Sequence, residues 1–309
     1  MKRRRFAGSE DLDRLQDFSS RCIKENGRTG MLHPGEIPHH IYNGLRHEDP
    51  TELVYLWEDD AGVIRAWTLL DPRRAGHDPQ FDTSMRQSSL EFEAEVNIWS
   101  EEALGTLMNQ RAIDSAFIET DAYEDDTERI GMLESLGWEA QSTETLMLSR
   151  RSLDELRPVE LPAGYTVRTG RGVEEAGRVA ELHAAGFGSS WTPELYARVM
   201  TSPGYSADRE FLVEAPNGDL AAFCVTWPDV VNRVGMFEPV AVHPDHRRLG
   251  LGRSVMRAGM AAMRSWGMRF AEVMYETDNA GSGPLYRDEG FVPTHKVVLF
   301  RKPVAATAE

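Results

Sequence analysis

Cysteine is nearly absent from this sequence. Only two of the 309 residues are cysteines, Cys22 and Cys224, and neither belongs to a Cys-x-x-Cys or Cys/His pattern. Small secreted folds that depend on disulfides carry many more cysteines, and structural zinc sites need closely spaced ligand pairs. The composition therefore excludes a disulfide framework, and we expect no metal in the protein.

Long apolar runs are lacking as well. No stretch approaches the roughly 18 apolar residues that a membrane-spanning helix needs. Residues 1–6 are basic and do not lead into the apolar core of a signal peptide. We therefore expect a cytoplasmic protein without membrane contact.

Basic residues are outnumbered, with 34 Lys and Arg against 50 Asp and Glu. Residues 1–150 hold 30 acidic and 16 basic side chains, a net charge of −14, whereas the remainder holds 20 and 18, a net charge of −2. Such a surface repels the phosphate backbone, which excludes nucleic acid as a partner. The acidic first half favours a cationic acceptor instead, unless its acids serve only to keep the protein soluble.

The two halves of the chain repeat one pattern. Each half ends with a strand, an acidic turn, a short helix, a Gly-aromatic pair and a last strand, so that Gly137-Trp138 matches Gly290-Phe291. Each half also opens with a strand and a helix, and its middle holds two β-rich runs separated by a turn. The next strand is predicted at residues 90–98 in the first half and 236–244 in the second, followed by a helix.

The resulting order in each half is β-α-β-β-β-α-β-α-β. It predicts an α/β protein (an α+β mixed sheet) of two tandem domains, each with a mixed, mostly antiparallel sheet flanked by helices. We place the first domain at residues 1–150, a proline-containing linker at 151–164 and the second domain at 165–309.

A short basic loop with two glycines lies between the predicted strand at Val240–Val242 and a helix. Gly250 and Gly252 let the backbone turn tightly, so that N–H groups at the helix N-terminus can point at phosphate oxygens. The loop fits neither a Walker sequence, since no lysine precedes Ser254, nor a dinucleotide loop, since the third glycine is missing. By itself, such a pair is equally compatible with an ordinary turn.

Further residues besides Gly250 and Gly252 support an anion site. The string Val242-His243-Pro244-x-x-Arg247-x-x-Gly250-x-Gly252 is followed by Asn279, Leu285-Tyr286 and Gly290-Phe291. The set covers roughly residues 235–302 and resembles the GNAT superfamily of N-acetyltransferases. The paired halves resemble the tandem arrangement of mycothiol synthases, although no motif selects that substrate.

This resemblance implies acetyl-CoA as co-substrate. The strand at 239–242 would splay from the strand at 270–275 and leave main-chain groups free for pantetheine, while the loop at 247–253 would hold the pyrophosphate. Tyr286 would protonate the departing thiolate, and a backbone N–H near Val240 or Ala241 would stabilise the oxyanion. The implied cofactor contacts are Val240, Ala241, Val242, Arg247, Arg248, Leu249, Gly250, Leu251, Gly252, Arg253, Asn279 and Tyr286.

Three acids compete for the role of general base. Glu238 is the first choice because it lies next to the expected splay, and Glu276 and Asp278 are the second choices. Each of the three could equally be a surface carboxylate. A covalent acyl-cysteine at Cys224 would need an activating histidine that the sequence does not place. Three aromatic residues fall in segments that line the acceptor pocket of the family or simply belong to the core: Phe187, Trp191 and Trp227.

The first half lacks these features. Aligned on the loop at 247–252, residues 98–105 have acids in place of arginines and no Gly-x-Gly. Aligned on the Gly-aromatic pair, Asp126 replaces Asn279 and Leu133 replaces Tyr286. We therefore interpret residues 1–150 as a degenerate GNAT-like copy without a CoA motif.

The leading hypothesis is an acetyl-CoA dependent N-acetyltransferase. It transfers the acetyl group directly, in a ternary complex, to a primary amine of a small molecule. The acidic half of the chain would favour an acceptor that is cationic. The alternatives are a non-catalytic CoA-binding regulatory module and a protein-lysine or N-terminal acetyltransferase.

Overall fold

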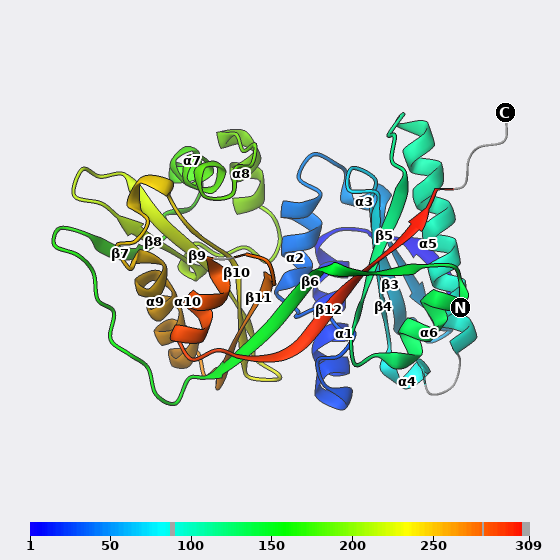
Figure 1. The fold of residues 1–309 in the computed structure, drawn as a ribbon. Coiled ribbons are helices and arrows are strands. Elements are labelled where there is room, and N and C mark those ends of the chain that lie inside the picture. The colour runs from blue at the N-terminus through cyan, green and yellow to red at the C-terminus, as the bar shows by residue number, and fades with distance from the viewer. Residues whose placement is uncertain (87–89, 280, 305–309) are drawn as a thin grey trace.

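A mixed sheet of twelve strands runs through the computed structural model, which describes residues 1–86, 90–279 and 281–304. The strand order is β1-β2-β3-β4-β5-β12-β6-β11-β10-β9-β8-β7. Neighbouring strands are antiparallel except for the pairs β4/β5 and β10/β11, so each half is a mostly antiparallel mixed sheet. Helices cover it on both faces (Figure 1), which confirms the predicted fold class.

The predicted element order recurs in both halves. The first half contains β1 (Lys2–Arg5), α1 (Ser9–Asn26), α2 (Glu36–Pro38), the π-helical turn η1 (His39–Gly44), α3 (Pro50–Leu53), β2 (Val54–Glu58), β3 (Ile64–Asp71), β4 (Gly76–Phe81), α4 (Thr83–Arg86), α5 (Leu90–Gln110), β5 (Phe117–Tyr123), α6 (Thr127–Ser135) and β6 (Glu139–Ser152). The second half contains β7 (Thr166–Thr169), η2 (Gly172–Glu175), α7 (Ala176–Phe187), α8 (Pro193–Met200), η3 (Ala207–Arg209), β8 (Glu210–Glu214), β9 (Leu220–Asp229), β10 (Val234–Val242), η4 (Pro244–His246), α9 (Leu251–Ser265), β11 (Phe270–Glu276), α10 (Ser282–Asp288) and β12 (Val292–Pro303).

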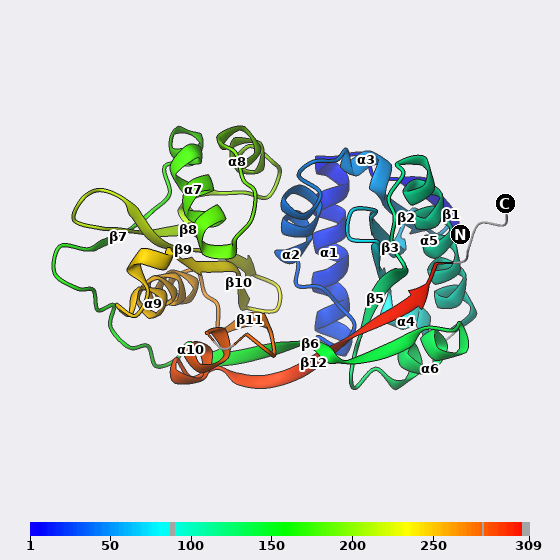
Figure 2. The same cartoon turned by 45° about the horizontal axis from the view of Figure 1, so that its top comes forward.

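The two halves exchange their last strands. β6, which ends the first half, pairs with β11 of the second half, and β12, which ends the second half, pairs with β5 of the first. The two exchanged strands also pair with each other and bridge the halves side by side (Figure 2). Each half therefore contributes a strand to the sheet of the other half. A domain boundary at residue 150 alone does not describe this exchange.

One predicted strand is wrong. Residues 90–98 begin the long helix α5, and the strand before it is β4, at Gly76–Phe81. The buried side chains Phe92, Val96, Ser100 and Leu104 recur every four residues, which is a helical spacing. β4 was missed because glycine, aspartate and proline disfavour strands in isolation.

Apolar side chains on both faces of the sheet form the core of the second half. Met256, Met260 and Met263 of α9 pack with α10 on one face, and α7 and α8 cover the other. Gly259 allows α9 to approach the sheet closely, since a Cβ there would lie 2.7 Å from the Phe237 ring. No helix among the described residues is long and apolar enough to cross a bilayer.

Candidate active site

An opening in the sheet lies between the ends of β10 and β11. Their parallel pairing stops at Phe237 and Val273, yet β10 continues beside β9 to Val242 and β11 continues beside β6 to Glu276. The strands thus diverge at the place where the resemblance implies a splay. A bulge at residues 238–239, between the pairs of β10 with β9, accompanies the divergence.

Main-chain groups of β10 face this opening. The His243 N–H donates to Ala221 O at 2.9 Å. Because antiparallel pairs alternate between bonded and non-bonded residues, the regular register from Val240 to Val242 directs the peptide groups of Val240 and Val242 away from β9, toward β11. Ala241 instead bonds toward β9.

The loop that follows β10 has the backbone shape of an anion nest. Arg248 and Gly250 both have left-handed φ angles, +64° and +80°, and α9 begins directly afterwards at Leu251. No acidic residue occupies the first turn of α9, so the positive end of its dipole is not neutralised there. This geometry fits the pyrophosphate of CoA.

The predicted contact residues of this loop are not equally accessible. Arg247, Arg248 and Leu249 are exposed, whereas Leu251 is buried in the core and offers only its backbone. Arg253 forms an ion pair with Asp288 at 2.6 Å. A Cβ at Gly252 would lie 3.3 Å from Leu285 and 3.4 Å from Val242, so this glycine lets the start of α9 lie close to both β10 and α10.

Tyr286 lies on α10 at the side of the opening. Its ring packs against Tyr275 and Phe291, with centroid distances of 5.1 and 6.0 Å, and the side chain is 6% exposed. No described residue forms a hydrogen bond with its hydroxyl. Burial, and secondarily Glu238, raises the pKa of Tyr286 well above its usual value, so the hydroxyl keeps its proton.

The other predicted polar residues lie nearby with different surroundings. Asn279 accepts hydrogen bonds from the Gly281 and Ser282 N–H groups at 3.1 and 3.2 Å, so its side chain caps the turn into α10. Glu276 and Asp278 are exposed, as expected of surface carboxylates.

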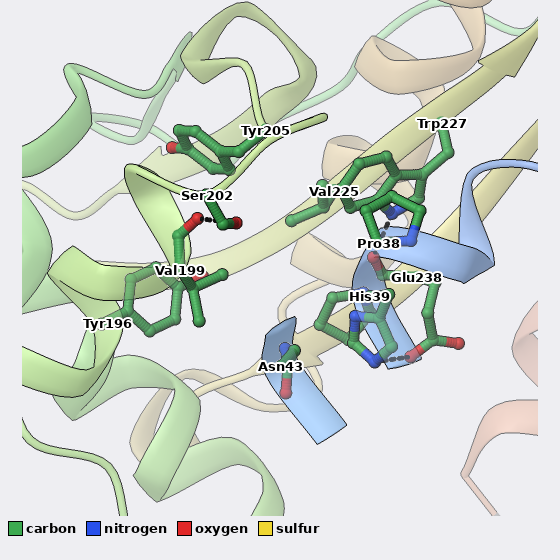
Figure 3. Close-up of a pocket in the computed structure, with 11 residues that line it drawn as sticks. Pro38, His39, Asn43, Tyr196, Val199, Ser202, Tyr205, Val225, Trp227 and Glu238 are labelled. Carbon is green, nitrogen blue, oxygen red and sulfur yellow. Dashed lines mark hydrogen bonds and ion pairs between the residues drawn. The ribbon is translucent and has the colours of Figure 1, made fainter. Parts of the chain in front are cut away.

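Glu238 differs from them because it lines a small enclosed pocket. Burial in this pocket, with a smaller contribution from Glu36, raises the pKa of its carboxyl to about 8. Its side chain is 28% exposed. The carboxyl lies 3.4 Å from the Nε2 of His39, and the Trp227 indole donates to the Glu238 main-chain carbonyl at 2.7 Å (Figure 3).

Both halves of the chain build this pocket, which has a volume of about 20 Å³, room for roughly one water molecule. Its lining residues are Pro38, His39 and Asn43 from the first half, Tyr196, Val199, Ser202 and Tyr205 from α8 and the loop after it, and Val225, Trp227, Glu238 and Pro239 from β9 and β10. Sequence reasoning named Trp227 and Glu238 and missed His39. Nothing local marks His39, because its partner lies 199 positions away in the chain.

The remaining candidates have mainly structural surroundings. Trp191 and Phe187 pack around His183 and do not line the pocket. Cys224 is fully buried, its thiol lies 3.5 Å from Val255 O, and burial raises its pKa well above the usual value. Cys22 is also buried and belongs to no disulfide, and the described residues contain no group of three or more potential metal ligands.

In the first half, the equivalent of the phosphate loop is not where the sequence alignment placed it. Residues 98–105 lie inside α5, because the strand that precedes the loop ends already at Phe81. The connection to α5 is residues 82–89, which contain no glycine; residues 87–89 lie outside the described part of the chain.

In the first half, side chains occupy the region that corresponds to the opening between β10 and β11. β4 and β5 share only one parallel pair, Gly76 with Glu119, so these strands diverge too. The buried Arg129 of α6 reaches across to Glu93 of α5 at 3.0 Å and donates to Asp121 O at 2.9 Å. Leu133, which replaces Tyr286, is buried in the core.

Comparisons with known proteins find similarity to acetyltransferases. Residues 177–291 match the model of the acetyltransferase (GNAT) family. A mycothiol acetyltransferase of Rhodococcus jostii is 24% identical over 94% of this chain and 96% of its own length. That of Streptomyces bingchenggensis is 30% identical over 48% of this chain, and the match spans only half of that relative's length.

Solved structures extend the likeness to the whole fold. A GCN5-related N-acetyltransferase from Sphaerobacter thermophilus superposes with a TM-score of 0.65 at 18% identity and covers 100% of this chain and 97% of its own. A tandem GNAT protein from the clavulanic acid biosynthesis pathway has a TM-score of 0.66 at 15% identity, with 99% of both chains covered. Residues 177–291 are therefore similar to GNAT-family acetyltransferases, and the chain as a whole has the fold of a tandem GNAT protein.

Proposed function

We propose that this protein is an acetyl-CoA dependent N-acetyltransferase that transfers the acetyl group directly to a primary amine of a small molecule. The observation that carries the proposal is the combination of two features. The strands splay, with the peptide groups of Val240 and Val242 directed into the opening, and the nest at Arg248–Gly250 precedes a helix N-terminus without acidic residues in its first turn. Phosphates and an extended amide chain are the ligand groups that such an arrangement suits.

Bound acetyl-CoA would supply an acetyl group activated as a thioester. Main-chain N–H groups of the opening would bind its pantetheine amides, and the loop at residues 247–253 its phosphates. The Val240 N–H would donate to the thioester carbonyl oxygen as negative charge develops there. Of the two backbone donors that the sequence left open, we favour Val240, because Ala241 bonds toward β9.

Two side chains would move protons. Glu238 would take a proton from the amine as its nitrogen forms a bond to the acetyl carbon, and its raised pKa makes it a stronger base than a surface carboxylate. Tyr286 would give its proton to the thiolate as the carbon–sulfur bond breaks. The hydroxyl can do so because no described group engages it and because it stays protonated.

Direct transfer is favoured over an acyl-cysteine route by the surroundings of Cys224. A thiol with a strongly raised pKa is a poor nucleophile, and this one is held in the core against Val255 O. A small acceptor is favoured over a protein because residues of both halves surround Glu238. Since the pocket there has room for roughly one water molecule, Glu238 would take the proton of the amine through that water. Both relatives described above are named mycothiol acetyltransferase, which also favours a small acceptor.

The acceptor class can be tested with a panel of amines and acetyl-CoA, scored by release of the CoA thiol. The panel should contain amino sugars, cysteine-like amines, polyamines, aminoglycosides and lysine peptides. We expect turnover with at least one small amine and little with the peptides. Faster turnover with lysine peptides would contradict the small-molecule assignment and support a protein acetyltransferase.

We predict that each chain binds one molecule of acetyl-CoA. The first half offers neither glycines in its loop nor free space between α5 and α6, since the buried pair Arg129–Glu93 lies there. Calorimetric titration of the full chain should give a stoichiometry near one, and Gly250→Val should abolish that single event. Two equivalent sites per chain would contradict this prediction.

A further inference from the structure

We propose that His39, supplied by the first half, is a positioning residue that orients the Glu238 carboxyl and stabilises its charged form. The inference rests on the proposed function, in which Glu238 is the general base. It assigns the first half a direct part in the chemistry of the second.

The contact itself is the first observation. Nε2 of His39 lies 3.4 Å from Oε1 of Glu238, and no other described side chain forms an ion pair or hydrogen bond with that carboxyl (Figure 3). Both side chains line the same pocket. Burial and neighbouring cations hold the pKa of His39 well below its usual value, so the ring is neutral and can face a carboxylate with an Nε2–H donor.

The segment that carries His39 is fixed against the second half, which is the second observation. His33 lies with Nε2 3.2 Å from Val234 O, at the start of β10. Gly35 lies against Trp227 so closely that a Cβ would be 2.0 Å from the Trp227 Cβ. These contacts precede His39 by only a few residues.

A buried ionic network continues this attachment. The Glu36 carboxylate accepts from Arg28 at 2.6 Å, and Arg28 also contacts Glu272 of β11 at 3.2 Å. Arg150 of the exchanged strand β6 reaches Glu272 as well, at 2.5 Å. A buried pair leaves an uncompensated charge when one partner is removed, so this network holds α2, and the turn η1 that follows it, in one place.

The local helix type points to a functional turn. η1 is a π-helical turn, and such turns are rare and occur frequently at functional sites. It brings His39 and Asn43 to the same pocket. The alternative, that His39 only fills space, does not account for a ring nitrogen directed at the one carboxyl that the reaction needs.

Other charged groups near His39 and Glu238 also influence the pKa values of these two side chains. Cationic and imidazole groups lower the proton affinity of His39, and Glu36 raises that of Glu238. Burial raises the pKa of Tyr286, and the negative charge of Glu238 also raises it. The groups that face the pair from the packed elements are Glu36 of α2, His40 of η1, Arg46 and Arg74 of the loops after η1 and β3, His183 of α7 and Tyr286 of α10.

The test compares two polar replacements in the full-length chain. In His39→Gln the amide nitrogen can reach the position of Nε2, whereas in His39→Asn it reaches only that of Nδ1 and loses the contact. We measure kcat/KM against pH with one amine that the wild type acetylates, together with the Kd of acetyl-CoA. His40→Gln is the matched control, because His40 is the next residue and does not line the pocket.

A donor that stabilises the carboxylate lowers the pH at which the base becomes available. The value of kcat/KM should rise with pH as Glu238 loses its proton. For His39→Asn we expect the midpoint of this rise to lie about one pH unit higher than in the wild type, with about tenfold lower kcat/KM below the midpoint. His39→Gln should retain most of the wild-type profile, and His40→Gln all of it. The acetyl-CoA Kd should stay within about twofold in all three variants, since the cradle is untouched.

A profile of His39→Asn that superposes on that of the wild type would overturn the inference. An equal shift in His40→Gln would also overturn it, because the effect would then come from the general field of the histidines. The proposed function fails in a different way, namely if the wild type acetylates no amine at all.

Discussion

Replacing Tyr286 by phenylalanine is expected to lower kcat by about 10² or more while acetyl-CoA affinity stays within a few-fold. The substitution removes only the hydroxyl, which no described residue engages, and keeps the ring that packs against Tyr275 and Phe291. The loss should appear in kcat because proton donation to the thiolate is needed in the transition state and not for binding.

The control for this prediction is Tyr55→Phe. Tyr55 is a partly buried tyrosine of the first half whose ring packs on Trp99 at 4.6 Å, so it loses the same atom far from the opening. Its kcat should equal that of the wild type. Nearly normal turnover in Tyr286→Phe would show that another group protonates the thiolate or that CoA leaves unaided.

Gly250→Val is expected to weaken acetyl-CoA binding by at least about 100-fold. A β-branched residue does not tolerate the φ of +80° at this position, so the nest and the first N–H groups of α9 must change direction. Two lost hydrogen bonds to a charged phosphate, at roughly 1.5 kcal/mol each, would account for a loss of that size.

The matched control is Gly218→Val in the turn between β8 and β9. Gly218 has a similar φ of +90°, and like Gly250 it has open space around the position of a Cβ. The two variants should therefore lose similar stability in thermal unfolding, and only Gly250→Val should lose acetyl-CoA in calorimetric titration. Equal affinities of both variants would refute the phosphate cradle.

The order of strands and helices could be predicted from the sequence because it depends on local patterns. The glycine loop before α9 and the pair Gly290-Phe291 are local motifs, and the parallel pairing that ends at Phe237 lies where the resemblance implied a splay. β4 failed the same reasoning, since Gly76 and Pro79 give it little strand propensity and its neighbours in the sheet specify it instead.

The contribution of the first half to the pocket could not be predicted in this way. His39 contacts Glu238 only because the exchange of β6 and β12 and the buried Arg28 network bring the two halves together. Arg28, Glu36 and Glu272 are separated by up to 244 positions, and no spacing rule connects them. The spacing of four between the apolar residues Phe92 and Val96, and again between Leu104 and Met108, was present in the sequence, by contrast, and it indicates a helix.

The most direct test of the central claim is to quantify both products of one reaction. The full-length protein is incubated with acetyl-CoA and the best amine of the panel, and the free CoA thiol and the acetylated amine are measured over time. We expect equal amounts of both, accumulating over many turnovers in the wild type and greatly reduced in Gly250→Val and Tyr286→Phe. Tight binding of acetyl-CoA without thiol release for any amine would contradict the account and identify a CoA-binding module without turnover.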